Sequence, residues 1–267
     1  MCHGIDFERI AAIGKEEAPL LAGTVGLRPH EVYSLTDGEL GCFLSHLKTW
    51  RKFVETGEEQ CLILEDDFVA SCSLRHFLNH FHEIKFNGDT IRLETYLIRV
   101  CLKNRPAYRA GGMALHNLYS AHWGAAAYIL SRTLAVRLAE SPELPLLPVD
   151  HLLFDPISPF FDPRRAFQAV PAPCVQGDRL PGQEDDIIYK SDLTPARDVK
   201  RQVSKQVAGR QSLLWRMRRE ILRVVNQIRN IPPRIVERLT RHWTVVPFSA
   251  NEPNTRHSSP DHSISFT

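Results

Sequence analysis

The chain has 267 residues, of which 43% are hydrophobic and 24% charged, and its formal net charge is +2. This length suits one globular domain with extensions and excludes a domain too small to bury its own core. Residues 1–15 lack a basic stretch followed by an apolar run, and no window approaches the roughly 18 apolar residues of a membrane-spanning helix. We therefore expect neither secretion nor a transmembrane helix.

The charge is distributed unevenly along the chain. Residues 197–241 contain thirteen Lys or Arg and three Asp or Glu, a net charge of +10, which leaves −8 for the remainder. An acidic body with a basic extension predicts a surface-binding appendage, and we expect no nucleic-acid partner. Two interpretations of the extension stay open. It is either a solvated segment or an interfacial helix, formed by residues 212–227, that attracts anionic phospholipid.

The six cysteines contain no C-x-x-C pair, and several lie in apolar runs, where a free thiol behaves as a small hydrophobe. This usage indicates a reducing compartment. We expect a cytoplasmic protein that attaches peripherally to the inner membrane if the extension binds lipid.

The first clear element is a helix. Thr36 and Glu39 have the spacing of a capping box, and apolar residues follow at helical intervals as far as Val54. Gly57 then stands where a left-handed residue commonly ends a helix. The pattern predicts a helix that begins after Thr36 and ends just before Gly57.

Strands and helices alternate after this helix. The expected strands are residues 61–64, 90–93 and 125–130. The expected helices are residues 74–84, capped by Ser73, and 132–140, capped by Ser131. This alternation predicts an α/β fold in which helices flank a mostly parallel sheet and ligands gather at the carboxyl ends of the strands.

The composition predicts three regions. Residues 1–190 form the globular domain, which includes a Pro-rich and mostly looped stretch at 142–173. Residues 191–246 form the basic helical extension, and residues 247–267, rich in Ser, Asn, Pro and His, are disordered.

Glu65, Asp66 and Asp67 directly follow the apolar run at 61–64. Three carboxylates at the end of a buried strand repel one another, so the arrangement is costly unless a cation compensates for it. The acid-x-acid pair of Glu65 and Asp67 suits Mg²⁺ or Mn²⁺, which could also take the diphosphate oxygens of a nucleotide. The alternative is a solvated acidic loop.

Six blocks of sequence, taken together in their order, resemble glycosyltransferase family 25, which includes bacterial lipooligosaccharide galactosyltransferases and animal collagen galactosyltransferases. The blocks are residues 38–46 (GELGCFLSH), 62–67 (LILEDD), 92–95 (RLET), 122–132 (HWGAAAYILSR), 148–154 (PVDHLLF) and 171–176 (PAPCVQ). The likeness spans residues 7–176 and is strongest to the bacterial lipooligosaccharide branch.

The resemblance implies a GT-A-type, Rossmann-like fold and a hexosyltransferase that takes part in lipooligosaccharide or lipopolysaccharide synthesis. It implies a nucleotide-sugar donor, commonly UDP-galactose, a saccharide acceptor, and inversion at the anomeric carbon. The expected divalent metal comes from the acidic pair, and the lipid-binding interpretation of the extension predicts that the acceptor is lipid-linked. A metal-dependent phosphoesterase or nucleotidyltransferase would also use paired carboxylates, but the sequence has no His-rich ligand set or Gly-rich phosphate loop.

Four residues are candidates for binding the donor. Gly38 and Gly41 bracket the first turn of the first helix, where missing side chains allow a phosphate to approach, although they equally suit tight helix packing. His46 either contacts the donor or is a buried, hydrogen-bonded structural histidine. Asp66, the middle carboxylate of the triplet, is the fourth candidate.

Inversion requires a base that removes the proton from the acceptor hydroxyl. A carboxylate on a loop suits this task, and Asp150, which stands in the Pro-rich stretch and is followed by His151, is the first candidate. Its alternative role is to cap a helix. Glu94, at the end of an expected strand, is the second. Trp123 either stacks on a sugar or belongs to the core.

Family members usually open with a hydrophobic strand and a basic residue, whereas this chain begins near residues 4–12, which resemble the segment after that opening. We expect an N-terminally incomplete domain with an unpaired sheet edge. The alternative function is therefore a truncated, inactive homologue that acts at most as a binding module.

Overall fold

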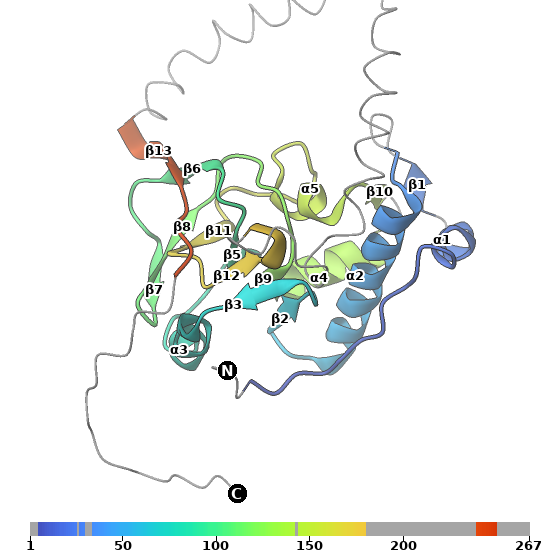
Figure 1. Cartoon of the computed structure of the whole chain (residues 1–267), viewed down its shortest axis with the longest axis horizontal. Helices are drawn as coiled ribbons and strands as arrows, with labels where there is room; N and C mark the ends of the chain where they lie inside the picture. The colour runs from blue at the N-terminus through green and yellow to red at the C-terminus, as the bar shows by residue number, and fades with distance from the viewer. Residues whose placement is uncertain (1–4, 26, 30–33, 142–143, 180–238, 250–267) are drawn as a thin grey trace, which may run out of the picture.

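The computed structural model describes residues 5–25, 27–29, 34–141, 144–179 and 239–249. Its centre is a six-stranded sheet with the order β2-β9-β4-β11-β8-β7 (Figure 1). The strands are β2 (Gln60–Leu64), β4 (Thr90–Arg92), β7 (Tyr108–Ala110), β8 (Met113–Asn117), β9 (Ala127–Ser131) and β11 (Ala166–Val170).

The sheet is mixed, so the predicted mostly parallel sheet is wrong. Only β4 and β11 run parallel, and the other neighbouring pairs are antiparallel. The apolar run at 61–64 is typical of strands buried on both faces of a parallel sheet, but β2 lies at the edge of the described sheet and runs antiparallel to β9. Strand direction depends on these long-range pairings, which a local apolar pattern does not encode.

Three smaller sheets adjoin the central one. They are β3 (Phe68–Ala70), β12 (Cys174–Gln176) and β5 (Glu94–Thr95) in that order, β6 (Arg99–Lys103) with β13 (Arg241–Val245), and β1 (Arg28–Pro29) with β10 (Pro145–Leu146). The chain passes from β4 of the central sheet to β5 of the three-stranded sheet with only Leu93 between them. Glu94 therefore lies where the two sheets meet.

Helices cover both faces of the central sheet (Figure 1). They are α1 (Ala18–Val25), α2 (Asp37–Thr56), α3 (Cys72–Phe81), α4 (Arg132–Glu140) and α5 (Val149–Phe154), followed by the short 3-10 helix η1 (Gly177–Arg179). Alternate residues of β9 point to opposite sides, so Tyr128 packs with α2, α4 and α5, whereas Ile129 packs with α3.

The predicted helix boundaries are largely confirmed. The capping box at α2 forms, since Thr36 Oγ1 accepts from Glu39 N at 3.2 Å and Glu39 Oε2 accepts from Thr36 N at 2.8 Å. Gly57 ends α2 with a φ of 79°. Ser131 caps α4 as predicted, but the N-cap of α3 is Ser71 and not Ser73.

Parts of the predicted extension and tail pack on the body. Strand β13 pairs with β6, and Ala172 exchanges backbone hydrogen bonds with Pro247 and Ser249. The expected lipid-binding helix at 212–227 lies outside the described residues, as do residues 250–267. No described helix has the length and apolar character needed to cross a bilayer.

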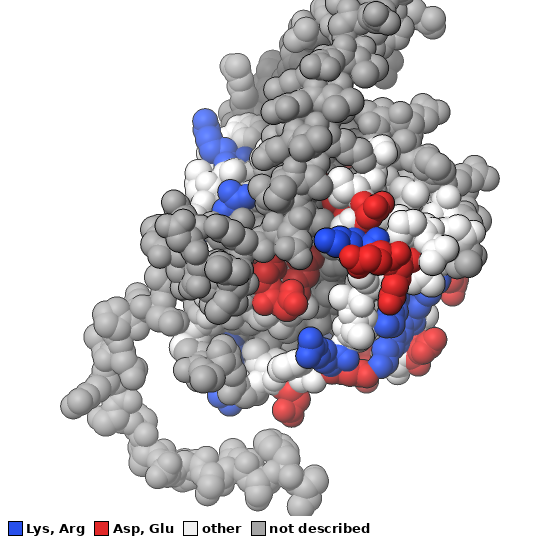
Figure 2. All heavy atoms as spheres, turned by 45° about the vertical axis from the view of Figure 1, so that its right-hand side comes forward, with Lys and Arg blue, Asp and Glu red and all other residues white. Residues whose placement is uncertain are grey.

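The described surface mixes both charge signs. Figure 2 shows Lys and Arg interspersed with Asp and Glu over one face of the body, with a group of acidic atoms near its centre. The predicted free thiols are found at Cys42, Cys61, Cys101 and Cys174, whereas Cys72 is disulfide-bonded.

Gly41 serves close helix packing. A Cβ at this position would lie 2.6 Å from the carbonyl oxygen of Ile13, whereas a Cβ at Gly23, in α1, would meet nothing within 4 Å. The packing interpretation of Gly41 is therefore favoured over an opening for a phosphate.

We predict that Gly41→Ala lowers the free energy of unfolding by about 1–3 kcal/mol, because the methyl group must displace backbone. Gly23→Ala is the matched control and should leave stability unchanged or raise it by up to about 1 kcal/mol through helix propensity. Urea unfolding of the two variants measures this, and equal effects would contradict the packing role.

Candidate functional site

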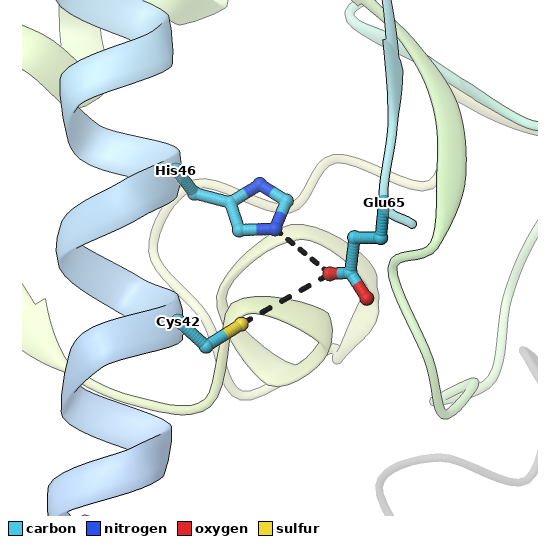
Figure 3. A group of neighbouring side chains, drawn as sticks. All are labelled: Cys42, His46 and Glu65. Atoms are coloured by element: carbon cyan, nitrogen blue, oxygen red, sulfur yellow. Dashed lines mark hydrogen bonds and ion pairs between the residues drawn. The ribbon is translucent and has the colours of Figure 1, made fainter. Parts of the chain in front are cut away.

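Glu65 follows β2 directly, and its side chain turns toward α2 (Figure 3). Its backbone N–H donates to Ala126 O at 2.8 Å, which extends the pairing of β2 with the start of β9. Glu65 Oε1 lies 2.8 Å from His46 Nε2 and 3.9 Å from Cys42 Sγ. Both contacts use the same oxygen, and Figure 3 shows the second carboxylate oxygen pointing away from α2.

His46 is buried and hydrogen-bonded through both ring nitrogens. Its Nδ1 lies 2.8 Å from Tyr128 Oη, which also accepts from Trp50 Nε1 at 2.9 Å. This chain of contacts fixes the imidazole between the core and Glu65. The arrangement matches the structural interpretation of His46 and makes it the residue that orients Glu65.

A buried ion pair joins Arg92 and Glu94, whose side chains are both 0% exposed. Arg92 Nη2 lies 3.0 Å from Glu94 Oε1, and that oxygen also accepts from Ala126 N at 2.8 Å. The guanidinium group donates to Gly124 O at 2.6 Å and to Trp123 O. One guanidinium group therefore holds the start of β5 and the loop before β9 in a fixed relation.

Gly124 completes this connection. Its φ of +86° favours glycine, and a Cβ here would lie 3.0 Å from Glu94 Oε1 and 3.2 Å from Arg92 Nη2. Its N–H donates to Asp150 Oδ2 at 2.9 Å. Asp150 is thereby tied to the ion pair although it lies on α5.

Glu65, Glu94 and Asp150 act electrostatically on Arg92, and Asp67 acts on Glu94. We call these four residues the carboxylate cluster. Burial lowers the pKa of Arg92, while Glu94, Asp150 and Glu65 act in the opposite direction. Burial raises the pKa of Glu94 to about 8; Arg92 opposes this shift, and the charges of Glu65 and Asp67 add to it. Four carboxyl groups thus gather near one guanidinium, and below a pH of about 8 Glu94 is the one that carries a proton.

The pKa of Glu94 predicts a pH-dependent stability. Between its ordinary pKa of 4.5 and about 8, the folded chain holds a proton on Glu94 that the unfolded chain has lost. The free energy of unfolding should therefore fall as the pH rises through this window, by at most about 1.4 kcal/mol per pH unit. Glu94→Gln should flatten this dependence.

Urea unfolding from about pH 5 to about pH 8 measures this effect. Glu58→Gln, at an exposed position after α2, is the matched control and should follow the wild type. A Glu94→Gln variant whose stability varied with pH as steeply as the wild type would contradict the assignment.

The structure places the other predicted residues as follows. Asp66 is exposed and Asp67 is half-buried, with Asp67 O accepting from Gly177 N at 2.9 Å. Gly38 is half-buried in the first turn of α2. Asp150 is neither in a loop nor the cap of α5, because the N-cap is Pro148 and Asp150 lies in the first turn. Its Oδ1 accepts from His151 N at 2.9 Å.

Trp123 is 45% exposed, so it does not belong to the core. Its ring packs edge-on against Tyr96, with centroids 6.3 Å apart, and Arg179 lies 4.0 Å above the Tyr96 ring. The neighbouring His122 is buried, and desolvation together with Arg92 lowers its pKa well below the ordinary range.

Sequence reasoning missed two central residues, Arg92 and Tyr128. A signal for Arg92 is present, because Arg92 and Glu94 alternate with Ile91 and Leu93 in a short apolar strand. Charged residues at such positions are buried only when paired. Tyr128 lies in an apolar strand without a comparable signal.

The family model "Glycosyltransferase family 25 (LPS biosynthesis protein)" matches residues 2–153, which contain the whole carboxylate cluster. The lipooligosaccharide biosynthesis protein lex-1 of Haemophilus influenzae is 31% identical over 205 residues, covering 72% of this chain and 66% of that protein.

Two other relatives extend the comparison. The lacto-N-neotetraose biosynthesis glycosyltransferase LgtB of Neisseria meningitidis serogroup B is 32% identical, over 65% of this chain and 66% of that protein. Procollagen galactosyltransferase 1 of Danio rerio is 30% identical, over 47% of this chain and 21% of that protein. The chain thus spans about two thirds or less of the length of these relatives.

Proposed function

Because the chain belongs to glycosyltransferase family 25, we propose that it transfers galactose from UDP-galactose to a saccharide acceptor in lipooligosaccharide synthesis, with inversion. The carboxylate cluster carries the proposal, since it joins the residues after β2 and the start of β5 to α5. The names of lex-1 and LgtB support a role in saccharide assembly. A sheet covered by helices on both faces is compatible with a GT-A-type fold.

The carboxylate cluster fits a hard divalent cation such as Mn²⁺ or Mg²⁺. The second oxygen of Glu65 points away from α2 (Figure 3), and Asp67 follows it two residues later at a half-buried position. Oxygen donors of this kind are the ones that these ions prefer. When bound, the ion would neutralise the charge that develops on the departing nucleoside diphosphate.

Asp150 is the residue we propose as the base. It is half-buried, and backbone N–H groups of Gly124 and His151 hold one oxygen each, so its carboxylate has a fixed direction. A free lone pair on either oxygen could take the proton of an acceptor hydroxyl. Glu94 is fully buried in the ion pair, so we assign it a positioning role and not direct contact with the acceptor.

Turnover tests the proposal. With UDP-galactose, Mn²⁺ and a truncated lipooligosaccharide acceptor, the wild type should form product, whereas Asp67→Asn and Asp150→Asn should lower kcat by at least about 100-fold. Asp37→Asn, at an exposed position in α2, is the control and should match the wild type. Asp150→Asn with wild-type kcat would remove Asp150 as the base.

The second candidate function is a binding module without turnover. The free edge of β2 favours it, since β2 pairs only with β9 among the described strands. The same turnover experiment separates the two functions when UDP binding is measured by calorimetry alongside it. Product formation contradicts the binding module, whereas UDP binding without product from any UDP-hexose supports it.

For the basic segment 197–241 we propose attraction to anionic phospholipid, which would keep the chain near a lipid-linked acceptor. The segment lies outside the described residues except at its last three positions. A test that deleted all residues after Lys190 would also remove β13, which pairs with β6 of the body. Substitution is therefore the better test. The substituted residues are Arg216, Arg218, Arg219 and Arg223, each changed to Gln.

We predict that the wild type sediments with phosphatidylglycerol vesicles and is released by high salt. Each lost charge removes roughly 1 kcal/mol of attraction, so the four substitutions should weaken binding at least about 100-fold. The control carries Gln at four exposed basic positions of the body, Arg75, Lys85, Lys103 and Arg105. Equal loss of binding in both variants would assign the attraction to the whole protein's charge.

A further inference from the structure

We propose that Cys42, His46 and Glu65 form a binding site for a thiophilic divalent metal ion of the Zn²⁺ class. Their ligand atoms, a thiol sulfur, an imidazole nitrogen and a carboxylate oxygen, all lie within 4.8 Å of one another (Figure 3). Sulfur, nitrogen and oxygen donors in this combination are characteristic ligands of protein-bound zinc.

The fold brings the three ligands together on rigid elements. Cys42 and His46 are four residues apart on α2, so their side chains lie on the same face of the helix, one turn from each other. Glu65 faces them from the end of β2. A helix and a strand that pack on the same core leave the ligands little freedom to separate.

The distances suit a tetrahedral ion after a small adjustment. Zinc bonds of about 2.0–2.3 Å place neighbouring ligand atoms roughly 3.4–3.6 Å apart. The nitrogen of His46 lies 2.8 Å from Glu65 Oε1, and the sulfur of Cys42 lies 3.9 Å from the same atom. A zinc ion would therefore require the Glu65 oxygen to move away from the nitrogen and toward the sulfur, each by less than about 1 Å.

The surroundings of His46 support a ligand role. A ligating histidine usually bonds through its other nitrogen to a neighbouring group that fixes the ring. Tyr128 Oη lies 2.8 Å from His46 Nδ1 and is itself held by Trp50. The phenol oxygen of Tyr128 can accept from both His46 Nδ1 and Trp50 Nε1. The imidazole ring of His46 would therefore keep its position when Nε2 binds a metal. Cys42 and Glu65 are half-buried, which leaves a fourth position for water.

This site differs from the proposed Mn²⁺ or Mg²⁺ site in ligand chemistry and in position. Thiolate and imidazole select zinc-like ions, whereas carboxylate sets select the harder ones. The site uses the oxygen of Glu65 that faces α2, and the other oxygen points away from it (Figure 3). The inference therefore does not rest on the proposed transferase activity.

Co²⁺ titration of the full chain tests the site, with a phosphine reductant that does not ligate the metal. We expect about one equivalent of Co²⁺ to give a thiolate-to-cobalt charge-transfer band, because cobalt replaces zinc in tetrahedral sulfur and nitrogen sites. Cys42→Ser should abolish this band. Cys61→Ser is the matched control, because Cys61 is also a half-buried free thiol but lies in β2, and this variant should keep the charge-transfer band.

Two outcomes would overturn the proposal: absence of the band in the wild type, or its persistence in Cys42→Ser. X-ray absorption of the zinc-loaded wild type gives an answer that needs no variant, because the proposal requires one sulfur together with nitrogen and oxygen in the first coordination shell. A shell of oxygen and nitrogen alone would also overturn it.

Discussion

The buried ion pair of Arg92 and Glu94 is the constraint on which the rest of the site depends. A guanidinium group at 0% exposure is tolerable only if its donors are satisfied, and here the carboxylate of Glu94 and the carbonyls of Trp123 and Gly124 receive them. Removing one partner of such a pair commonly costs about 3–5 kcal/mol, because the other charge stays buried. The loop before β9 and the start of β5 are consequently fixed together, and Gly124 connects Asp150 to them.

Glu65 links this constraint to the helical layer. Its backbone pairs with the start of β9, and its side chain is oriented by His46, which Tyr128 and Trp50 hold in turn. One carboxylate oxygen therefore faces the sulfur and nitrogen ligands on α2 and the other faces away (Figure 3). The two metal sites that we propose can share Glu65 because a hydrogen-bonded chain of side chains sets the direction of its carboxylate.

The local elements could be predicted from the sequence, but their pairing could not. The capping box of Thr36 and Glu39 and the cap at Ser131 depend on contacts within four residues, so the sequence pattern is sufficient. The antiparallel pairing of β2 with β9 joins residues more than sixty positions apart, which no local pattern encodes. Glu65, Glu94 and Asp150 were singled out separately, whereas Arg92, the residue that gathers them, was not, because its role appears only when distant segments meet.

The most direct test of the account is the position of a divalent ion in crystals grown with UDP and Mn²⁺. The account predicts an anomalous scattering peak that contacts a carboxylate oxygen of Glu65, on the side away from His46, and a carboxylate oxygen of Asp67. A Mn²⁺ peak that contacts neither residue, with UDP bound elsewhere on the chain, would contradict the assignment of the carboxylate cluster as the donor site.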